Sequence, residues 1–154
     1  MCCSRLRPGG PDSRGDAVTT EAEITWIEDR RFVGTASSGH AIVVDSSAEK
    51  MGPSPMELLL IGMAGCTAHD VIGILKKKRQ AVTGLKVITQ AERAEEPPRV
   101  YTVINIEYVV RGRGIKPKAV EDAIRLSKET YCSASIMLGK TARITTSYRI
   151  EDEA

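Results

Sequence analysis

The sequence predicts an α+β fold in which antiparallel strands accompany one long central helix. Three features indicate this fold: a strongly apolar run over residues 53–79, several segments that alternate apolar and polar residues, and turn residues between those segments. The chain has 154 residues, with 42% hydrophobic and 4% aromatic content, which suits one domain with a mainly aliphatic core. The expected helices are segregated from the strands, as in α+β proteins.

The N-terminal segment differs in composition from the rest of the chain. Residues 1–16 are rich in Gly, Pro, Arg and Ser without apolar periodicity, so we expect a disordered tail before one domain over residues 17–154. The segment lacks the apolar region of a secretory signal, which favours a cytoplasmic protein with reduced thiols. Cys2 and Cys3 lie in this tail and are interpreted as incidental thiols rather than metal ligands or acylation sites.

Residues 20–46 are predicted to form an antiparallel meander of three strands. Apolar residues alternate there at a period of about two, and polar turn sequences at residues 28–31 and 37–39 separate the segments. The later elements follow from the same patterns and from Pro and Gly at their ends. Strands are expected at 82–96, 99–111 and 141–150, and helices at 116–131 and 133–138.

The long apolar run has the signals of a capped helix. Ser54 can act as the N-cap, Pro55 suits the first helical position, and Glu57 suits the positive end of the helix dipole. A helix that is apolar nearly all round is expected to be buried. Its length approaches that of a membrane span, but His69 and Asp70 inside it argue against a membrane location.

Three chemically active residues fall on one side of this helix. At about 100° per residue, Cys66, His69 and Asp70 share a stripe. Cys66 is either a nucleophilic thiol or a small buried apolar residue, and His69 is either its partner or a buried structural histidine. With Cys132, the pair Cys66 and His69 could also bind zinc, although no Cys-x-x-Cys pair supports that interpretation.

Cys132 and three glycines add to the pattern. Cys132 begins a predicted helix, where the helix dipole lowers the pKa of a thiol, so a redox-active pair with Cys66 is predicted. Gly62, Gly65 and Gly73 weaken the central helix by about 1 kcal/mol each relative to Ala, which a sequence accepts where another backbone must come close. That neighbour is either a second copy of the helix or another part of the same chain.

The sequence resembles the OsmC/Ohr family of thiol-dependent peroxidases, and most of all its YhfA-like branch. The resemblance is carried by residues 54–59 and 65–66, and by Tyr131-Cys132-Ser133. It extends in order over residues 20–151. Supporting stretches lie at residues 26–28, 32–34, 38–40, 97–99 and 144–148.

The resemblance implies an intertwined homodimer with the central helices in its core and two sites at the subunit interface. It implies that Cys66 is the peroxidatic cysteine, which becomes a sulfenic acid, and that Cys132 resolves it as an intramolecular disulfide. A lipoamide-type or other external dithiol would then reduce the disulfide. Such a cycle needs no metal and no organic cofactor.

The sequence departs from the family pattern at one position and leaves another unassigned. Peroxidases of the family carry a Glu ten residues before the reactive cysteine, where this chain has Met56, while the neighbouring Glu57 is expected to point away from Cys66. The family also uses an Arg from the early strands to stabilise the thiolate. Arg31 is the candidate for that role, with Arg30 as the alternative.

The predicted function is therefore reduction of organic hydroperoxides or hydrogen peroxide in oxidative stress defence. The alternative is a non-catalytic member of the family that binds an apolar small ligand at the dimer interface. The charge balance of 22 basic and 20 acidic residues, a formal net charge of +2, shows no footprint for nucleic acid. The expected partners are a second copy, a small peroxide and a dithiol reductant, with no nucleic acid and no membrane.

Overall fold

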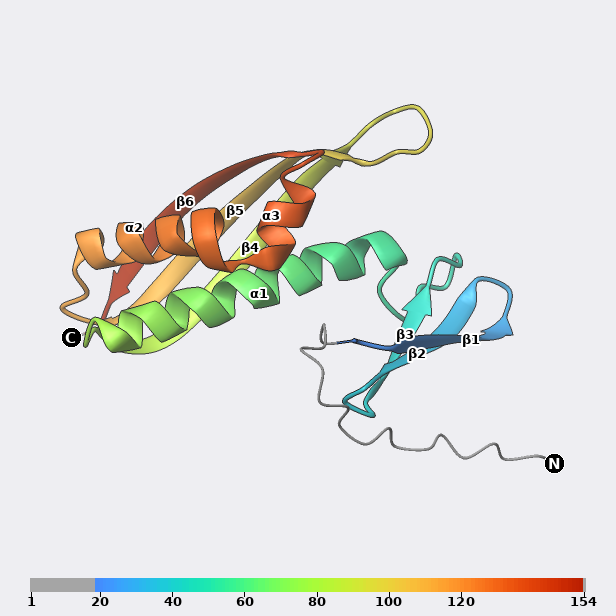
Figure 1. The fold of residues 1–154 in the computed structure, drawn as a ribbon, viewed down its shortest axis with the longest axis horizontal. Helices are drawn as coiled ribbons and strands as arrows, with labels where there is room; N and C mark the ends of the chain where they lie inside the picture. Colours follow the sequence, from blue (N-terminus) through green and yellow to red (C-terminus); the bar gives the residue numbers. More distant parts are fainter. Residues whose placement is uncertain (1–18, 154) are drawn as a thin grey trace, which may run out of the picture. The chain divides into compact units, whose positions relative to one another are not determined.

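The computed structural model describes residues 19–153, and the chain divides into two compact units, with the boundary after Pro53. The first unit holds a three-stranded antiparallel sheet in the order β1-β2-β3, which confirms the predicted meander (Figure 1). Its strands are β1 (Ala22–Glu28), β2 (Arg31–Ala36) and β3 (Ala41–Asp45). The tail expected over residues 1–16, with Cys2 and Cys3, lies outside the described residues.

The second unit begins with the central helix, α1 (Pro55–Lys77). Its start is confirmed as a capping box. The Glu57 backbone N–H donates to Ser54 Oγ at 3.3 Å, and the Ser54 backbone N–H donates to Glu57 Oε2 at 2.7 Å. Local chemistry therefore determines where the helix begins, and the carboxylate of Glu57 serves the cap.

A second three-stranded sheet supports this helix. Its order is β4-β5-β6, with β4 antiparallel and β6 parallel to β5. The α+β class is confirmed, but the expectation of purely antiparallel pairing is wrong for β6. The connection between β5 and β6 carries two helices that cross over the sheet, and such a crossover returns the chain parallel to its earlier strand. The strands are β4 (Ala81–Arg93), β5 (Tyr101–Arg113) and β6 (Arg143–Asp152).

The crossover contains an irregular helical segment. Helix α2 (Pro117–Leu126) continues into one π-helical turn, η1 (Ser127–Tyr131), which ends at Cys132, the N-cap of α3 (Ser133–Leu138). The Cys132 backbone N–H donates to the Ser127 carbonyl at 2.8 Å. The wide turn was not expected from the sequence, which predicted one regular helix over residues 116–131. Helices α1, α2 and α3 gather on one face of the sheet (Figure 1).

The core lies between this face of the sheet and the helices. Helix α1 buries residues spaced four apart, and β5 buries alternate residues, as expected for a helix stripe packed on a sheet. The helix contributes Met63, Thr67, Val71 and Leu75, β5 contributes Ile104, Ile106, Tyr108 and Val110, and α2 contributes Ala119, Val120, Ala123 and Ile124.

Only this one stripe of α1 is buried within the chain, so the expectation of burial on all sides is not met by one copy. Leu59 is 47% exposed and Ile61 is 57% exposed. A Cβ added at Gly62, Gly65 or Gly73 would meet no atom within 4 Å among the described residues beyond the helix itself. Close packing inside the chain therefore does not explain these glycines.

Buried hydroxyl groups connect α1 to the sheet and to η1. Thr67 Oγ1 lies 2.7 Å from the hydroxyl of Tyr108 on β5 and 2.9 Å from Ser127 Oγ on η1. All three residues are at most 1% exposed. Because buried hydroxyls are costly unless they are paired, the three groups fix where η1 sits against α1.

We expect Thr67→Val to lower the free energy of unfolding by about 1–3 kcal/mol, because the substitution keeps the shape but deprives the buried Tyr108 and Ser127 hydroxyls of a partner. Urea denaturation followed by circular dichroism measures the change. Thr146→Val, at an exposed position of β6, is the control and should change stability by less than about 0.5 kcal/mol. Equal stability of Thr67→Val and the native protein would contradict the structural role of the hydroxyl groups.

Candidate functional site

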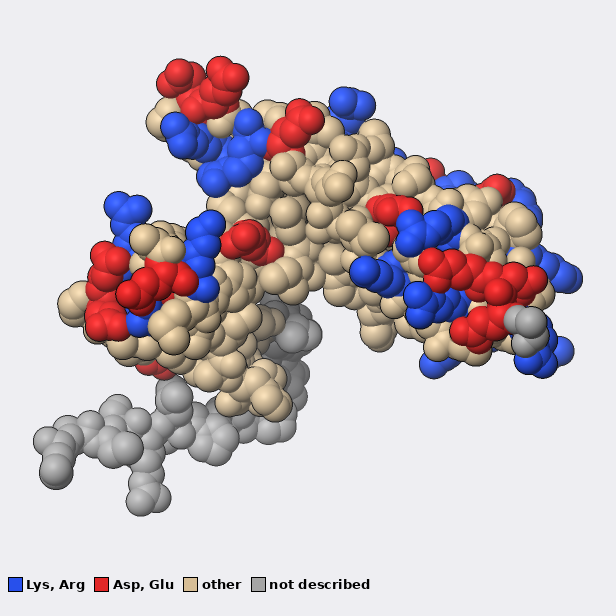
Figure 2. Space-filling view, turned by 180° about the vertical axis from the view of Figure 1, so that it is seen from behind, with Lys and Arg blue, Asp and Glu red and all other residues tan. Residues whose placement is uncertain are grey.

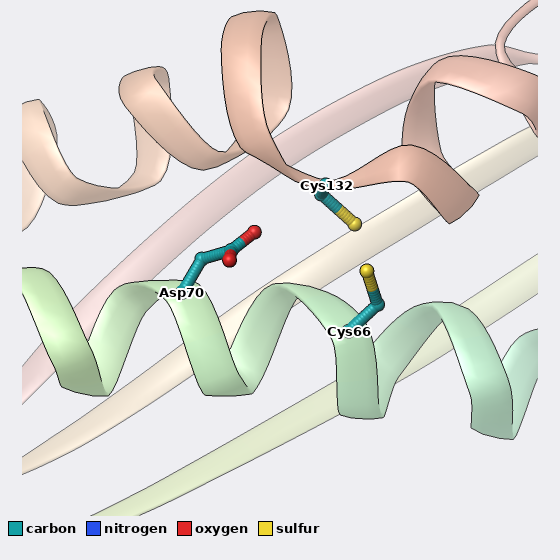
Figure 3. A group of neighbouring side chains, drawn as sticks. All are labelled: Cys66, Asp70 and Cys132. Atoms are coloured by element: carbon teal, nitrogen blue, oxygen red, sulfur yellow. The ribbon is translucent and has the colours of Figure 1, made fainter. Parts of the chain in front are cut away.

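Two cysteines from distant parts of the sequence meet beside α1. The sulfur atoms of Cys66 and Cys132 and a carboxylate oxygen of Asp70 all lie within 4.8 Å of one another. The two sulfurs point toward each other, and Asp70 projects from the next turn of α1 beside them (Figure 3). The predicted meeting of the two thiols is therefore confirmed as a geometric fact.

The local fold explains how these side chains converge. Cys66 and Asp70 are four residues apart on α1, so they lie one above the other on the same helix face. Cys132 reaches them from the junction between η1 and α3, where the backbone changes from the π turn to an extended N-cap. The position of the second thiol thus depends on the irregular turn before it.

The two thiols differ in their environment. Cys66 is half-buried, whereas Cys132 is completely buried. Burial raises the pKa of the Cys132 thiol, and the neighbouring Cys66 raises it further, while hydrogen bonds from Ser135 oppose the rise. The Ser135 backbone N–H and hydroxyl donate to Cys132 Sγ at 3.4 and 3.1 Å. The expectation that the helix N-terminus lowers this pKa is wrong, because desolvation outweighs the N-terminal donors.

Asp70 is held by the buried hydroxyl groups described above. Ser127 Oγ donates to Asp70 Oδ2 at 3.0 Å, and Ser127 is in turn bonded to Thr67. The helical pattern placed Asp70 on the stripe with Cys66 but assigned it no role. Its partner could not be found from the sequence, because Ser127 is 57 residues away along the chain.

His69 does not join the thiols. It is exposed in this chain and lines a groove of about 420 Å³ together with Asp70, Lys77 and Tyr131. The expectation of a buried structural histidine is therefore wrong for the single chain. The zinc arrangement considered from the sequence also does not form, because His69 is outside the group of donor atoms around Cys66 and Cys132.

The three donor atoms that do converge are fewer than a structural zinc site uses. Such sites have four protein ligands in a tetrahedron, and no fourth His, Cys, Asp or Glu among residues 19–153 joins the group. The group consists of a thiol pair with an adjacent carboxylate.

Arg31, the expected stabiliser of the thiolate, is part of an ion-pair cluster in the first unit. Its guanidinium contacts Asp45 at 3.1 Å, Glu28 at 2.5 Å and Glu49 at 3.2 Å. The pKa of Asp45 lies well below its usual range, chiefly because of hydrogen bonds from Ser47, with Arg31 contributing. The cluster joins β2 and β3 to the loop that follows them, and a contact between Arg31 and Cys66 stays a prediction.

Met56, at the position where family peroxidases carry a Glu, has a structural role here. Its side chain packs against the core, and its carbonyl accepts a hydrogen bond from the Tyr101 hydroxyl at 2.7 Å. Glu57 bonds to Ser54 at the start of the helix. Among the carboxylates of the described residues, Asp70 is the one that has an oxygen within 4.8 Å of both sulfurs.

Comparison with known proteins gives a consistent result. The model of the OsmC-like protein family matches residues 47–147. Protein YhfA of Escherichia coli (strain K12) is 44% identical over 130 residues, which cover 84% of this chain and 97% of that protein. A solved structure of a hypothetical protein from Aquifex aeolicus VF5 is 33% identical, with a TM-score of 0.82, over 90% of this chain and 100% of that one.

More distant structures share the fold. The organic hydroperoxide resistance protein OhrB of Bacillus subtilis is 14% identical, with a TM-score of 0.61, over 86% of this chain and 98% of that one. At this identity the likeness concerns the fold alone. The family model and the closer relatives together cover most of the chain, and so the chain belongs to the OsmC-like protein family.

Proposed function

We propose that the protein is a thiol-dependent peroxidase that reduces organic hydroperoxides or hydrogen peroxide in oxidative stress defence. The observation that carries the proposal is the meeting of a half-buried and a fully buried thiol within 4.8 Å. Membership of the OsmC-like family supports it, and organic hydroperoxide resistance proteins share the fold. The chemistry requires two thiols and a dithiol reductant, so the proposal includes no metal and no organic cofactor.

We propose roles for the two cysteines that are supported by their difference in burial. Cys66 is open enough to meet a peroxide, and its thiolate attacks the O–O bond to give a sulfenic acid and release an alcohol or water. Cys132 is shielded from solvent but faces Cys66, so it attacks the sulfenic sulfur, forming the disulfide and releasing water. An external dithiol then reduces the disulfide and restores both thiols.

Arg31 is the proposed cation for the Cys66 thiolate. Its guanidinium already contacts three carboxylates, which reduces the positive potential it can offer to a further anion. We therefore propose that its contribution to the reactivity of Cys66 is smaller than that of an unpaired arginine.

A second candidate is a non-catalytic member of the family that binds an apolar ligand. The groove beside the thiols favours it, because Ile74, Leu126 and Tyr131 line one part of its surface. Alkylation of Cys66 by iodoacetamide over a range of pH distinguishes the two functions. Rapid alkylation at neutral pH supports the peroxidase, whereas alkylation confined to alkaline pH supports the binding protein.

We propose that a second copy covers the exposed side of α1. By length and apolar composition α1 could cross a membrane, a test that core helices of soluble proteins also pass. One stripe of the helix packs on the sheet, and His69 and Asp70 interrupt the rest, so a protein partner fits better than lipid. A homodimer in the cytoplasm covers Leu59 and Ile61 and gives the glycines a close neighbour.

The surface charge supports small partners rather than nucleic acid. On the face drawn in Figure 2, basic and acidic residues are intermingled in each charged region. Nucleic-acid binding proteins concentrate basic residues in one patch or stripe. A peroxide, a dithiol and a second copy are the partners we propose.

Cys66→Ser should reduce peroxide consumption, measured with dihydrolipoamide or dithiothreitol as the reductant, to the rate without protein, because serine cannot form the thiolate nucleophile. Cys132→Ser should still form a sulfenic acid that a dimedone probe traps, but no intramolecular disulfide. Unchanged turnover by Cys66→Ser would show that the proposed mechanism is wrong.

Ile61→Glu should convert a dimer into monomers, because it places a charge in the apolar contact proposed for α1. Sedimentation velocity measures the change in mass, and Lys118→Glu, at an exposed position of α2, serves as the control that should remain dimeric. A native protein that sediments as a monomer, or an Ile61→Glu variant that stays dimeric, would rule out this interface.

A further inference from the structure

We propose that Asp70 transfers the proton of the resolving step: its carboxylate accepts the proton of Cys132 and passes it to the oxygen that leaves Cys66. The inference rests on the proposed function, because it concerns the step in which the disulfide forms. It assigns a role to a carboxylate that lies within 4.8 Å of both sulfurs.

The resolving step needs a proton acceptor at this place. Cys132 must lose its proton to attack the sulfenic sulfur, yet its side chain is completely shielded from solvent. Burial also raises the pKa of this thiol, so the protonated form predominates at neutral pH. Meanwhile the hydroxyl group departing from Cys66 leaves far more easily as water than as hydroxide.

Asp70 is the group placed to meet both requirements. Among the His, Cys, Asp and Glu side chains of the described residues, Asp70 is the only further one with a ligand atom within 4.8 Å of both sulfurs. The other titratable side chains around Asp70 belong to the groove and the hydroxyl chain: His69, Lys77, Lys78, Tyr131 and Tyr108.

The buried hydroxyl chain has one direction of donation. A carboxylate only accepts hydrogen bonds, so Ser127 Oγ donates to Asp70. Ser127 then accepts from Thr67, and Thr67 accepts from the Tyr108 hydroxyl. This arrangement holds Asp70 Oδ2 in place, while the second carboxylate oxygen is not needed for the chain.

The step balances without a further reactant. The Cys132 S–H bond breaks and its proton moves to Asp70, while the Cys132 sulfur forms a bond to the Cys66 sulfur. The S–O bond of the Cys66 sulfenic acid breaks, and Asp70 returns the proton to the departing oxygen, which leaves as water. Cys132 is oxidised and the sulfenic sulfur is reduced, so the peroxide used in the preceding step is the only oxidant.

Single-turnover experiments with Asp70→Asn test this role. Reduced protein is mixed with an organic hydroperoxide, and samples are quenched with dimedone to trap sulfenic acid and with N-ethylmaleimide to count free thiols. We expect sulfenic acid to form at a nearly native rate, whereas disulfide formation should slow by about a hundredfold. In Asp70→Asn the Cys132 thiol must lose its proton to solvent. Disulfide formation in this variant should therefore become about tenfold faster for each unit by which the pH is raised, up to the pKa of Cys132, whereas the rate in the native protein should be nearly independent of pH.

Glu121→Gln is the matched control. Glu121 also accepts a hydrogen bond from a hydroxyl, that of Tyr148 at 2.9 Å, and it is not among the residues that line the groove beside the thiols. It should resolve the sulfenic acid at the native rate. Ser127→Ala keeps the carboxylate but removes its donor, and we expect a smaller loss in the same step. Native rates of disulfide formation and an unchanged pH profile in Asp70→Asn would overturn the proposal.

A further arm separates this proposal from the proposed function. Cys66 is converted to a mixed disulfide with dithiodipyridine. Cys132 then attacks the Cys66 sulfur and displaces thiopyridone, whose release is used to measure the rate of this step. This step needs deprotonation of Cys132 but no peroxide, so it remains measurable even where peroxide reduction fails. Slow, pH-dependent release in Asp70→Asn supports the relay independently, and release at the native rate contradicts it.

Discussion

A short series of buried hydroxyl groups controls the arrangement of the site. Thr67 on α1 connects Tyr108 on β5 to Ser127 on η1, and Ser127 holds Asp70. Each of these groups would be unfavourable in the core without its partner, so α1 and η1 are fixed relative to one another. Cys132 follows η1 directly, and its distance from Cys66 depends on that arrangement.

The same packing gives the two thiols different environments. Helix α1 leaves Cys66 half-buried beside its packed stripe, whereas Cys132, the N-cap of α3, is completely buried. A half-buried thiol close to a fully buried one suits a cycle in which the first reacts with the peroxide and the second reacts only with the sulfenic acid that results. The buried Cys132 thiol then needs a nearby group to accept its proton. This need connects the proposed peroxidase activity to the role proposed for Asp70.

The sequence predicted features with local causes and missed those that depend on distant contacts. The capping box of Ser54 and Glu57 placed the start of α1, and helical spacing placed Cys66 beside Asp70. The parallel pairing of β6 and the π turn before Cys132 depend on the crossover packing, which leaves no local signal. The pKa of Cys132 was predicted in the wrong direction because the helix N-terminus is visible in the sequence and burial is not. A contact between Arg31 and Cys66 stays a prediction.

Mapping the disulfide tests the central claim most directly. Reduced protein is treated with one equivalent of an organic hydroperoxide, digested under non-reducing conditions and examined by mass spectrometry. We predict a linked pair of peptides, one containing Cys66 and the other Cys132, formed within a single chain. A Cys132 thiol that remains reduced beside a Cys66 oxidised to sulfinic acid, or a Cys66 linked to Cys66 of a second copy, would contradict the proposed roles of the two cysteines.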